Sequence, residues 1–135
     1  MNFRHLHLDF DSIDIRGGSK MSVRSVLDAM RLQSKDEHEK GRKFEQLMRA
    51  FLKTDLQYSR MFDEVWLWMD YPGRAGRPDT GIDLVAREKN SGDLIAIQCK
   101  FYAPETVISK PDVDSFLASS SKSEFNGRLF ITTTD

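Results

Sequence analysis

The stretch that decides the fold is IDLVAREKNSGDLIAIQCKF, residues 82–101. Residues 82–88 and 93–101 have the apolar and β-branched composition that is typical of strands. The polar residues 89–92 between them end in glycine and predict a turn. The two segments are therefore expected to pair as an antiparallel hairpin. The unbroken apolar run at residues 94–97 predicts that the second strand is buried on both faces.

The register of this hairpin decides which polar side chains meet. An even-numbered loop within residues 89–92 places Asp83 opposite Gln98, whereas an odd-numbered loop shifts the pairing. Gln98 and Lys100 share a face of their strand because they are alternate residues. In the even register Lys100 is the diagonal neighbour of Asp83, about 7–8 Å away. A carboxylate, an amide and an ammonium group are thus expected to converge at one end of the hairpin, while Cys99 points the other way into the core.

The segment before the hairpin has the periodicity of helices. Apolar residues at helical spacing predict one helix over residues 23–32 and a longer one over residues 36–56. Gly41 lies on the core side of the longer helix, where its lack of a side chain would let another backbone approach, and Glu45 lies at the rim of that side. The core-facing stripe consists of Phe44, Leu47, Met48, Phe51 and Leu52.

The rest of the chain supplies further strands and one more helix. Residues 65–69 predict a short strand, and residues 74–81, rich in glycine and arginine, predict an irregular loop. Pro111 opens a helix that extends to about residue 122, and residues 128–133 predict a final strand. A strand–helix–strand unit at the end favours a mixed sheet with helices packed on it, so we expect an α/β fold.

Length and composition exclude several classes of protein. The chain has 135 residues, of which 39% are hydrophobic and 30% charged, which fits one globular domain. Its single cysteine, Cys99, excludes an intrachain disulfide and a four-cysteine zinc site. No apolar run approaches the roughly 20 residues of a membrane span, and we expect a cytoplasmic protein without a membrane partner. The net charge of −1 lacks the basic excess of a free-standing nucleic-acid binder, although a metal-holding nuclease pocket must itself be acidic.

Residues 1–20 differ in character from the rest of the chain. Apolar and polar residues alternate from residue 5 to residue 11 and predict a short strand, which glycines 17 and 18 end. Met21 would make a natural start, so we expect residues 1–20 to be a leader or a non-native extension. Residues 21–135 are expected to form the domain proper, as a fragment of a larger protein.

A carboxylate beside a lysine suits metal-assisted phosphodiester hydrolysis. Asp83 would hold Mg²⁺ through its oxygens, and the metal would lower the pKa of a bound water. Lys100 would orient or deprotonate that water, or stabilise the charge that develops on the phosphate. From its rim position Glu45 could reach toward the same metal, and Asp79 is a further carboxylate in the loop.

These groups also have structural interpretations. Asp83 and Lys100 would serve as a cross-strand ion pair, and Gln98 as an amide whose hydrogen bonds are satisfied. Glu45 on its own would be a solvated helix residue. On residue types alone these interpretations are the more common ones, so the choice depends on the order of the motifs.

Two arginines and two tryptophans stand out beside the hairpin. Arg74 and Arg77, in the loop, are the best candidates for contacts with nucleic-acid phosphates, and the alternative is a solvated loop. Trp66 and Trp68 could stack on bases, but core packing is favoured for them.

Three motifs resemble those of the Mrr-like branch of the PD-(D/E)xK nucleases. They are Gly41-Arg42-Lys43-Phe44-Glu45, Asp79-Thr80-Gly81-Ile82-Asp83-Leu84 and Gln98-Cys99-Lys100. The resemblance covers residues 36–133, and it includes a glutamine where most of the superfamily has an acid. It implies a restriction-endonuclease-like mixed central sheet flanked by helices.

The resemblance also implies a role for each motif residue. It implies that Asp83 is a metal ligand, that Gln98 occupies the second active-site position and that Lys100 is the catalytic lysine. Glu45 would be the acid carried by the helix and a further metal ligand. Asp79 matches a common first aspartate of the D-x-G-x-D pattern.

The implied activity is that of a metal-dependent endonuclease acting on double-stranded DNA in a restriction system that defends against phage. Its cofactor would be Mg²⁺, for which Mn²⁺ substitutes. Similar domains commonly stand at the N-terminus of single-polypeptide enzymes, so a fused helicase-like motor and a methyltransferase or recognition domain are implied as partners. The alternative is a catalytically degenerate nuclease-fold module used for DNA binding or assembly, and a third interpretation is a small structural domain.

Overall fold

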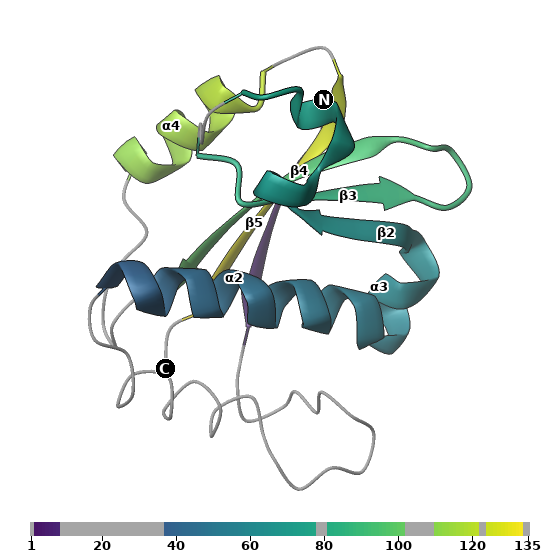
Figure 1. Cartoon of the computed structure of the whole chain (residues 1–135), viewed down its shortest axis with the longest axis horizontal. Helices are drawn as coiled ribbons and strands as arrows, with labels where there is room; N and C mark the ends of the chain where they lie inside the picture. The colour runs from purple at the N-terminus through teal and green to yellow at the C-terminus, as the bar shows by residue number, and fades with distance from the viewer. Residues whose placement is uncertain (1, 9–36, 78–80, 102–109, 122–123, 134–135) are drawn as a thin grey trace, which may run out of the picture.

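The fold is seen in a computed structural model of the chain, which describes residues 2–8, 37–77, 81–101, 110–121 and 124–133 (Figure 1). The expected helix at residues 23–32 lies outside the described residues.

A single five-stranded sheet forms the centre of the domain. Its strand order is β1-β5-β4-β3-β2. The strands are β1 (Asn2–Leu8), β2 (Phe62–Leu67), β3 (Leu84–Glu88), β4 (Leu94–Phe101) and β5 (Phe125–Thr133). β1 and β4 run parallel to β5, whereas β3 runs antiparallel to β4 and to β2. The mixed sheet predicted from the sequence is therefore confirmed.

Helices cover both faces of this sheet. The long helix α2 (Glu37–Thr54) lies along one face, and α4 (Lys110–Ser119) lies on the other (Figure 1). The short helix α3 (Leu56–Met61) follows α2 and leads into β2. In the part of the chain that the structure describes, no helix is both long and apolar enough to cross a membrane.

The hairpin has the even register. Leu84 pairs with Ile97, and Glu88 N donates to Asp93 O at 2.9 Å across a loop at residues 89–92. Gly92 ends that loop with a φ of 74°, a left-handed conformation that favours glycine. This is the predicted register, but the pairing stops at Leu84, one residue before Asp83 would stand opposite Gln98. Asp83 N donates instead to Ile97 O at 2.9 Å.

The end of the long helix differs from the prediction. The apolar stripe predicts one helix to residue 56, but α2 ends at Thr54 and α3 begins at Leu56. Asp55 separates them, because its carboxylate accepts hydrogen bonds from the backbone N–H groups of Gln57 and Tyr58 and so caps a new helix.

The strand predicted at residues 65–69 starts earlier and ends earlier, as β2. Trp68 begins a 3₁₀ turn, Trp68–Asp70, and is buried. Its backbone N–H donates to Asp83 O at 2.9 Å. Core packing of Trp68 is thus confirmed, although it does not share a strand with Trp66.

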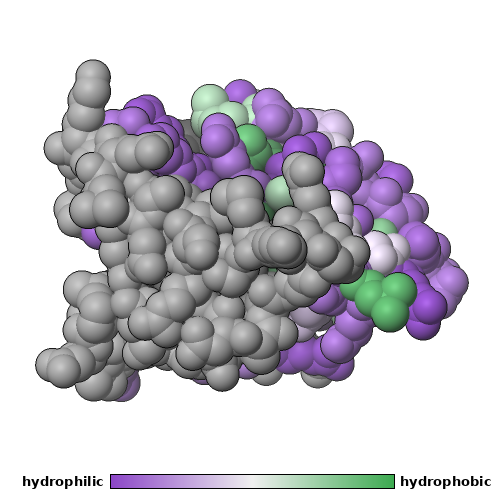
Figure 2. Space-filling view, turned by 90° about the horizontal axis from the view of Figure 1, so that it is seen from below, coloured by the Kyte–Doolittle hydropathy of each residue, from purple (hydrophilic) through white to green (hydrophobic). Residues whose placement is uncertain are grey.

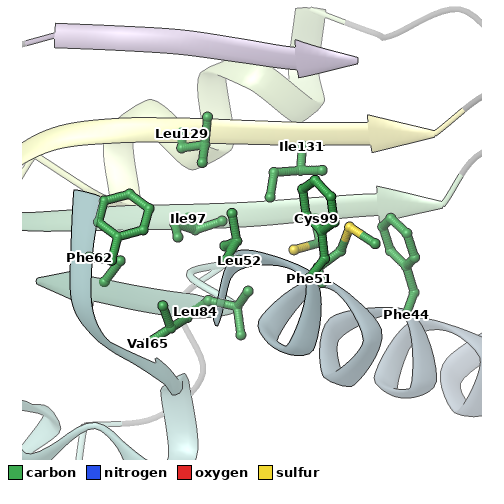
Figure 3. Close-up of a cluster of buried hydrophobic side chains, with 12 residues drawn as sticks. Phe44, Phe51, Leu52, Phe62, Val65, Leu84, Ile97, Cys99, Leu129 and Ile131 are labelled. Carbon is green, nitrogen blue, oxygen red and sulfur yellow. The ribbon is translucent and has the colours of Figure 1, made fainter. Parts of the chain in front are cut away.

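Two apolar clusters, one on each face of the sheet, hold the layers together. On the first face Phe44, Phe51 and Leu52 of α2 point toward Ile97 and Ile131 of the central strands (Figure 3). The second cluster joins α4 to the sheet and includes Phe116, Phe130, Ala96, Val85 and Trp68. Seen from below, the described surface is mainly hydrophilic with small hydrophobic spots, as expected when the apolar side chains face the sheet (Figure 2).

The edge strand β1 confirms that a strand is formed near the N-terminus. His5 Nε2 lies 2.7 Å from Thr132 Oγ1 of the neighbouring β5, so one polar side chain of β1 is tied to the sheet. The expectation that residues 1–20 are a leader stays a prediction.

Leu52→Ala is expected to lower the free energy of unfolding by about 2–5 kcal/mol, because it would leave a cavity between α2 and the sheet. Leu52 has no exposed surface, whereas Leu56, a matched control four residues later, is 68% exposed. Leu56→Ala should change stability by less than about 0.5 kcal/mol. Urea denaturation of both variants tests this, and equal losses would contradict the packing described.

Candidate active site

The site begins where the β3–β4 ladder stops. Strand pairing ends at Leu84 and Ile97, but β4 continues to Phe101. Beyond that point the Cys99 N–H donates to Asp83 Oδ2 at 2.8 Å. The carboxylate of Asp83 thus occupies the place of a strand neighbour and satisfies a backbone donor that the shortened β3 leaves behind.

The chain turns away from the sheet immediately before this point. Gly81 has a φ of 91°, in the left-handed region that favours glycine. Asp83 N still donates to Ile97 O at 2.9 Å, so the backbone of Asp83 is held at the edge of β4. The Gly81 turn and this hydrogen bond together fix the position of the carboxylate.

A cavity of about 240 Å³ opens beside the overhanging end of β4. We call it the α2–β4 cavity. Its lining residues are Lys40, Gly41, Phe44, Glu45, Asp83, Gln98, Cys99 and Lys100. Four residues that the sequence predicted to act together, Asp83, Gln98, Lys100 and Glu45, therefore border one space.

Helix α2 brings Glu45 to this cavity. Phe44, the preceding residue, is buried against the sheet with 1% of its surface exposed, which sets the rotation of the helix. Glu45 is consequently half-buried at the rim. It also borders a second depression, together with Asp83, Trp68 and Met69, so Glu45 and Asp83 stand where the two hollows adjoin.

Gln98 is an unusual buried side chain. Only 7% of its surface is exposed, and its Oε1 has no hydrogen-bond partner in the described structure. A buried polar atom without a partner costs about 1–3 kcal/mol. The Oε1 of Gln98 is thus unsatisfied in the described structure, so the interpretation of this residue as a fully satisfied structural amide lacks support.

The charges around the cavity affect the pKa of the Cys99 thiol. Burial raises the pKa of the Cys99 thiol, and the negative charges of Asp83 and then Glu45 raise this pKa further. Both carboxylates thus act on the same buried atom from two different elements. Cys99 itself packs in the core beneath α2, as predicted (Figure 3).

Lys100 does not make the expected structural ion pair. It is half-buried at the cavity, and among the described residues it has no ion pair within 4.0 Å. The structural interpretation of Lys100 as one half of a cross-strand salt bridge therefore lacks support in this geometry.

The donor chemistry of the cavity fits a hard divalent cation. The described segments contain no group of three or more His, Cys, Asp or Glu side chains placed to hold a metal ion. The cavity is instead lined by Asp83, Glu45 and Gln98, whose side chains carry two carboxylates and an amide. All three groups offer oxygen, which Mg²⁺ prefers. Asp79 lies outside the described residues.

Lys40 and Gly41 are cavity residues to which the sequence analysis gives no chemical role, although Gly41 opens the first motif. Among the described residues no atom lies within 4 Å of a Cβ built on Gly41, so no described backbone makes the close approach that was expected there. Lys40 stands four residues before the core residue Phe44, and Gly41 stands four residues before the site residue Glu45. Residues four apart share a face of a helix, so this spacing could have predicted that Lys40 and Gly41 lie near the site.

The two loop arginines, both partly exposed, are held by contacts within the protein. Arg77 Nη1 lies 2.6 Å from Glu124 Oε1, and Arg77 Nη2 donates to Gly73 O at 2.7 Å. The Arg77 guanidinium also stands 5.3 Å from the centre of the Trp68 ring, and Arg74 Nη1 donates to Arg77 O. These contacts fasten the loop to the start of β5, while contact with DNA phosphates stays a prediction.

The Gln98 geometry gives a test that separates stability from function. Gln98→Leu is expected to raise the free energy of unfolding by about 1 kcal/mol, because it removes a buried acceptor that has no partner and keeps a similar volume. Gln57→Leu, at an exposed position of α3, is the control and should change stability by less than about 0.5 kcal/mol. Urea denaturation measures both, and a marked loss of stability in Gln98→Leu would show that the amide is structurally satisfied.

Comparison with known proteins gives one match. A family model described as a restriction endonuclease (Mrr_cat_2) matches residues 53–135, more than half of the chain. Asp83, Gln98 and Lys100 lie inside the matched segment, whereas Glu45 lies before it. No curated protein and no solved structure matches the chain.

Proposed function

The chain belongs to this restriction endonuclease family, and from that premise we propose that the α2–β4 cavity is a divalent-metal site at which double-stranded DNA is cut. The observation that carries the proposal is the convergence of Asp83, Glu45, Gln98 and Lys100 on one cavity from α2, the β3 edge and β4.

Asp83 and Glu45 are the proposed metal ligands, and the amide oxygen of Gln98 is a third donor. Mg²⁺, or Mn²⁺ in its place, would supply a water of lowered pKa and offset charge on the phosphate. The hydrogen bond from Cys99 N to Asp83 Oδ2 fixes the orientation of one ligand before any cation enters. Preorganisation of this kind lowers the cost of assembling a site.

Lys100 is the proposed cationic group of the reaction. Its ammonium Nζ donates hydrogen bonds, so it would hold the attacking water or a non-bridging phosphate oxygen as negative charge develops there. A half-buried ammonium acts more strongly than a solvated one because water screens it less. Its position on the same strand as Gln98 keeps it next to the proposed metal ligands.

The setting that we propose is a restriction enzyme that defends its host against phage. The net charge of −1 gives the domain little general affinity for DNA, so a fused helicase-like motor and a methyltransferase or recognition domain would supply binding and sequence choice. The cytoplasm is the proposed location because the substrate is intracellular DNA.

A second candidate function is a degenerate nuclease-fold module that binds DNA or assists assembly. The glutamine at position 98, in place of an acid, is the observation that favours it, since an amide is a weaker cation ligand than a carboxylate. The two functions separate on cleavage, because only the nuclease makes metal-dependent breaks.

Asp83→Asn is expected to reduce metal-dependent nicking of supercoiled DNA by at least about 100-fold, because the negative charge at the proposed metal is lost. The amide oxygen of the new side chain can still accept the Cys99 N–H, so the fold should survive. Lys100→Met should give a similar loss, and Lys89→Met, in the exposed hairpin loop, is the matched control that retains activity. Plasmid nicking with Mg²⁺ and thermal melting are measured together, and full nicking by either site variant would refute the assignment.

A further inference from the structure

We propose that Lys40 and Gly41, on the turn of α2 that borders the α2–β4 cavity, bind the phosphodiester backbone of the DNA strand being cut. This inference deepens the proposed function and rests on it. Lys40 would supply the cation, and Gly41 would leave room for the sugar–phosphate chain to pass close to the helix. The two residues thus form a track that leads to Asp83 and Glu45.

The open space at Gly41 is the first observation. Glycine within a helix is less stable than alanine by about 0.5–1 kcal/mol, and here no atom of the described residues requires it. In the described part of the chain a Cβ at this position would meet nothing within 4 Å, and the residue lines the cavity. A molecule that approaches the helix from the cavity would account for a glycine at this position.

The placement of Lys40 is the second observation. Lys40 lines the cavity, whereas Lys43, one turn later on α2, does not. Lys40 and Lys100 therefore bring two cations to a space that holds the two carboxylates Asp83 and Glu45. A polyanion needs such cations before it can approach an acidic cavity.

Gln98, which also lines the cavity, adds an unsatisfied polar atom to this region. Its Oε1 is buried and has no hydrogen-bond partner in the described structure. The chemistry at the rim favours recognition of the DNA backbone over recognition of bases. The Lys40 ammonium can contact a phosphate, and Gly41 has no side chain that could contact a base edge. The expected ligand is therefore a phosphodiester chain of any sequence.

Gly41→Ala and Gly41→Leu test the open space. Alanine and leucine are both better helix formers than glycine, so each variant should melt about 3 °C higher than the wild type. Metal-dependent kcat/KM should nevertheless fall with side-chain size, and for leucine by about tenfold or more. Unchanged kcat/KM in the leucine variant would overturn the proposal, since the space would then be irrelevant to the substrate.

Lys40→Ala and its control Lys43→Ala test the cation. Binding of each full chain to a random-sequence duplex oligonucleotide is measured at several salt concentrations. Lys40→Ala should weaken binding about five- to tenfold and lower the slope of log K against log salt by about 0.9, the value for one phosphate contact, whereas Lys43→Ala should match the wild type. Rescue of the slope by Lys40→Arg would support a charge contact.

The outcomes separate a failure of the proposed phosphate contact from a failure of the nuclease assignment. If the wild type cuts DNA and Lys40→Ala keeps the wild-type salt slope, the phosphate track is wrong and the nuclease assignment stands. If the wild type neither cuts nor binds the duplex, the proposed function and the track fail together.

Discussion

The hydrogen bond from the Cys99 N–H to the carboxylate of Asp83 is the interaction on which the rest of the site depends. It lies where β3 has ended and β4 continues, and it replaces the strand neighbour that a longer β3 would supply. A longer β3 would close the sheet edge and leave no α2–β4 cavity. A shorter one would leave a buried donor unsatisfied, at a cost of about 1–3 kcal/mol. The single carboxylate therefore ends the ladder and at the same time faces the cavity.

Two residues that line the cavity lower the stability of the fold. In the described structure Gln98 Oε1 is buried without a partner, and Gly41 weakens a helix that has room for a side chain. Each of these costs would be removed by an ordinary substitution. Costs of this kind gather at functional sites in proteins, and here both belong to one cavity.

The sequence predicts the parts of this structure that depend on local pattern. The even loop at residues 89–92 was enough to predict the register of the hairpin, in which Leu84 pairs with Ile97. The break between α2 and α3 was missed, since apolar residues continue on both sides of Asp55 and only the cap interrupts the helix. The contact of Arg77 with Glu124, and the absence of a described atom within 4 Å of a Cβ at Gly41, depend on how distant segments are arranged. Such non-local facts are absent from any local window of sequence.

The family match and the cavity cover different parts of the chain. The match begins at residue 53 and includes β3 and β4, while the cavity adds Glu45 from the helix before it. The central claim is that Asp83 and Glu45 hold one divalent cation between them. Its most direct test is anomalous diffraction from crystals of the chain soaked with Mn²⁺. The account predicts a Mn²⁺ peak in coordination contact with both carboxylates, and it is contradicted if the cavity stays empty at saturating Mn²⁺ or if the ion binds without Glu45.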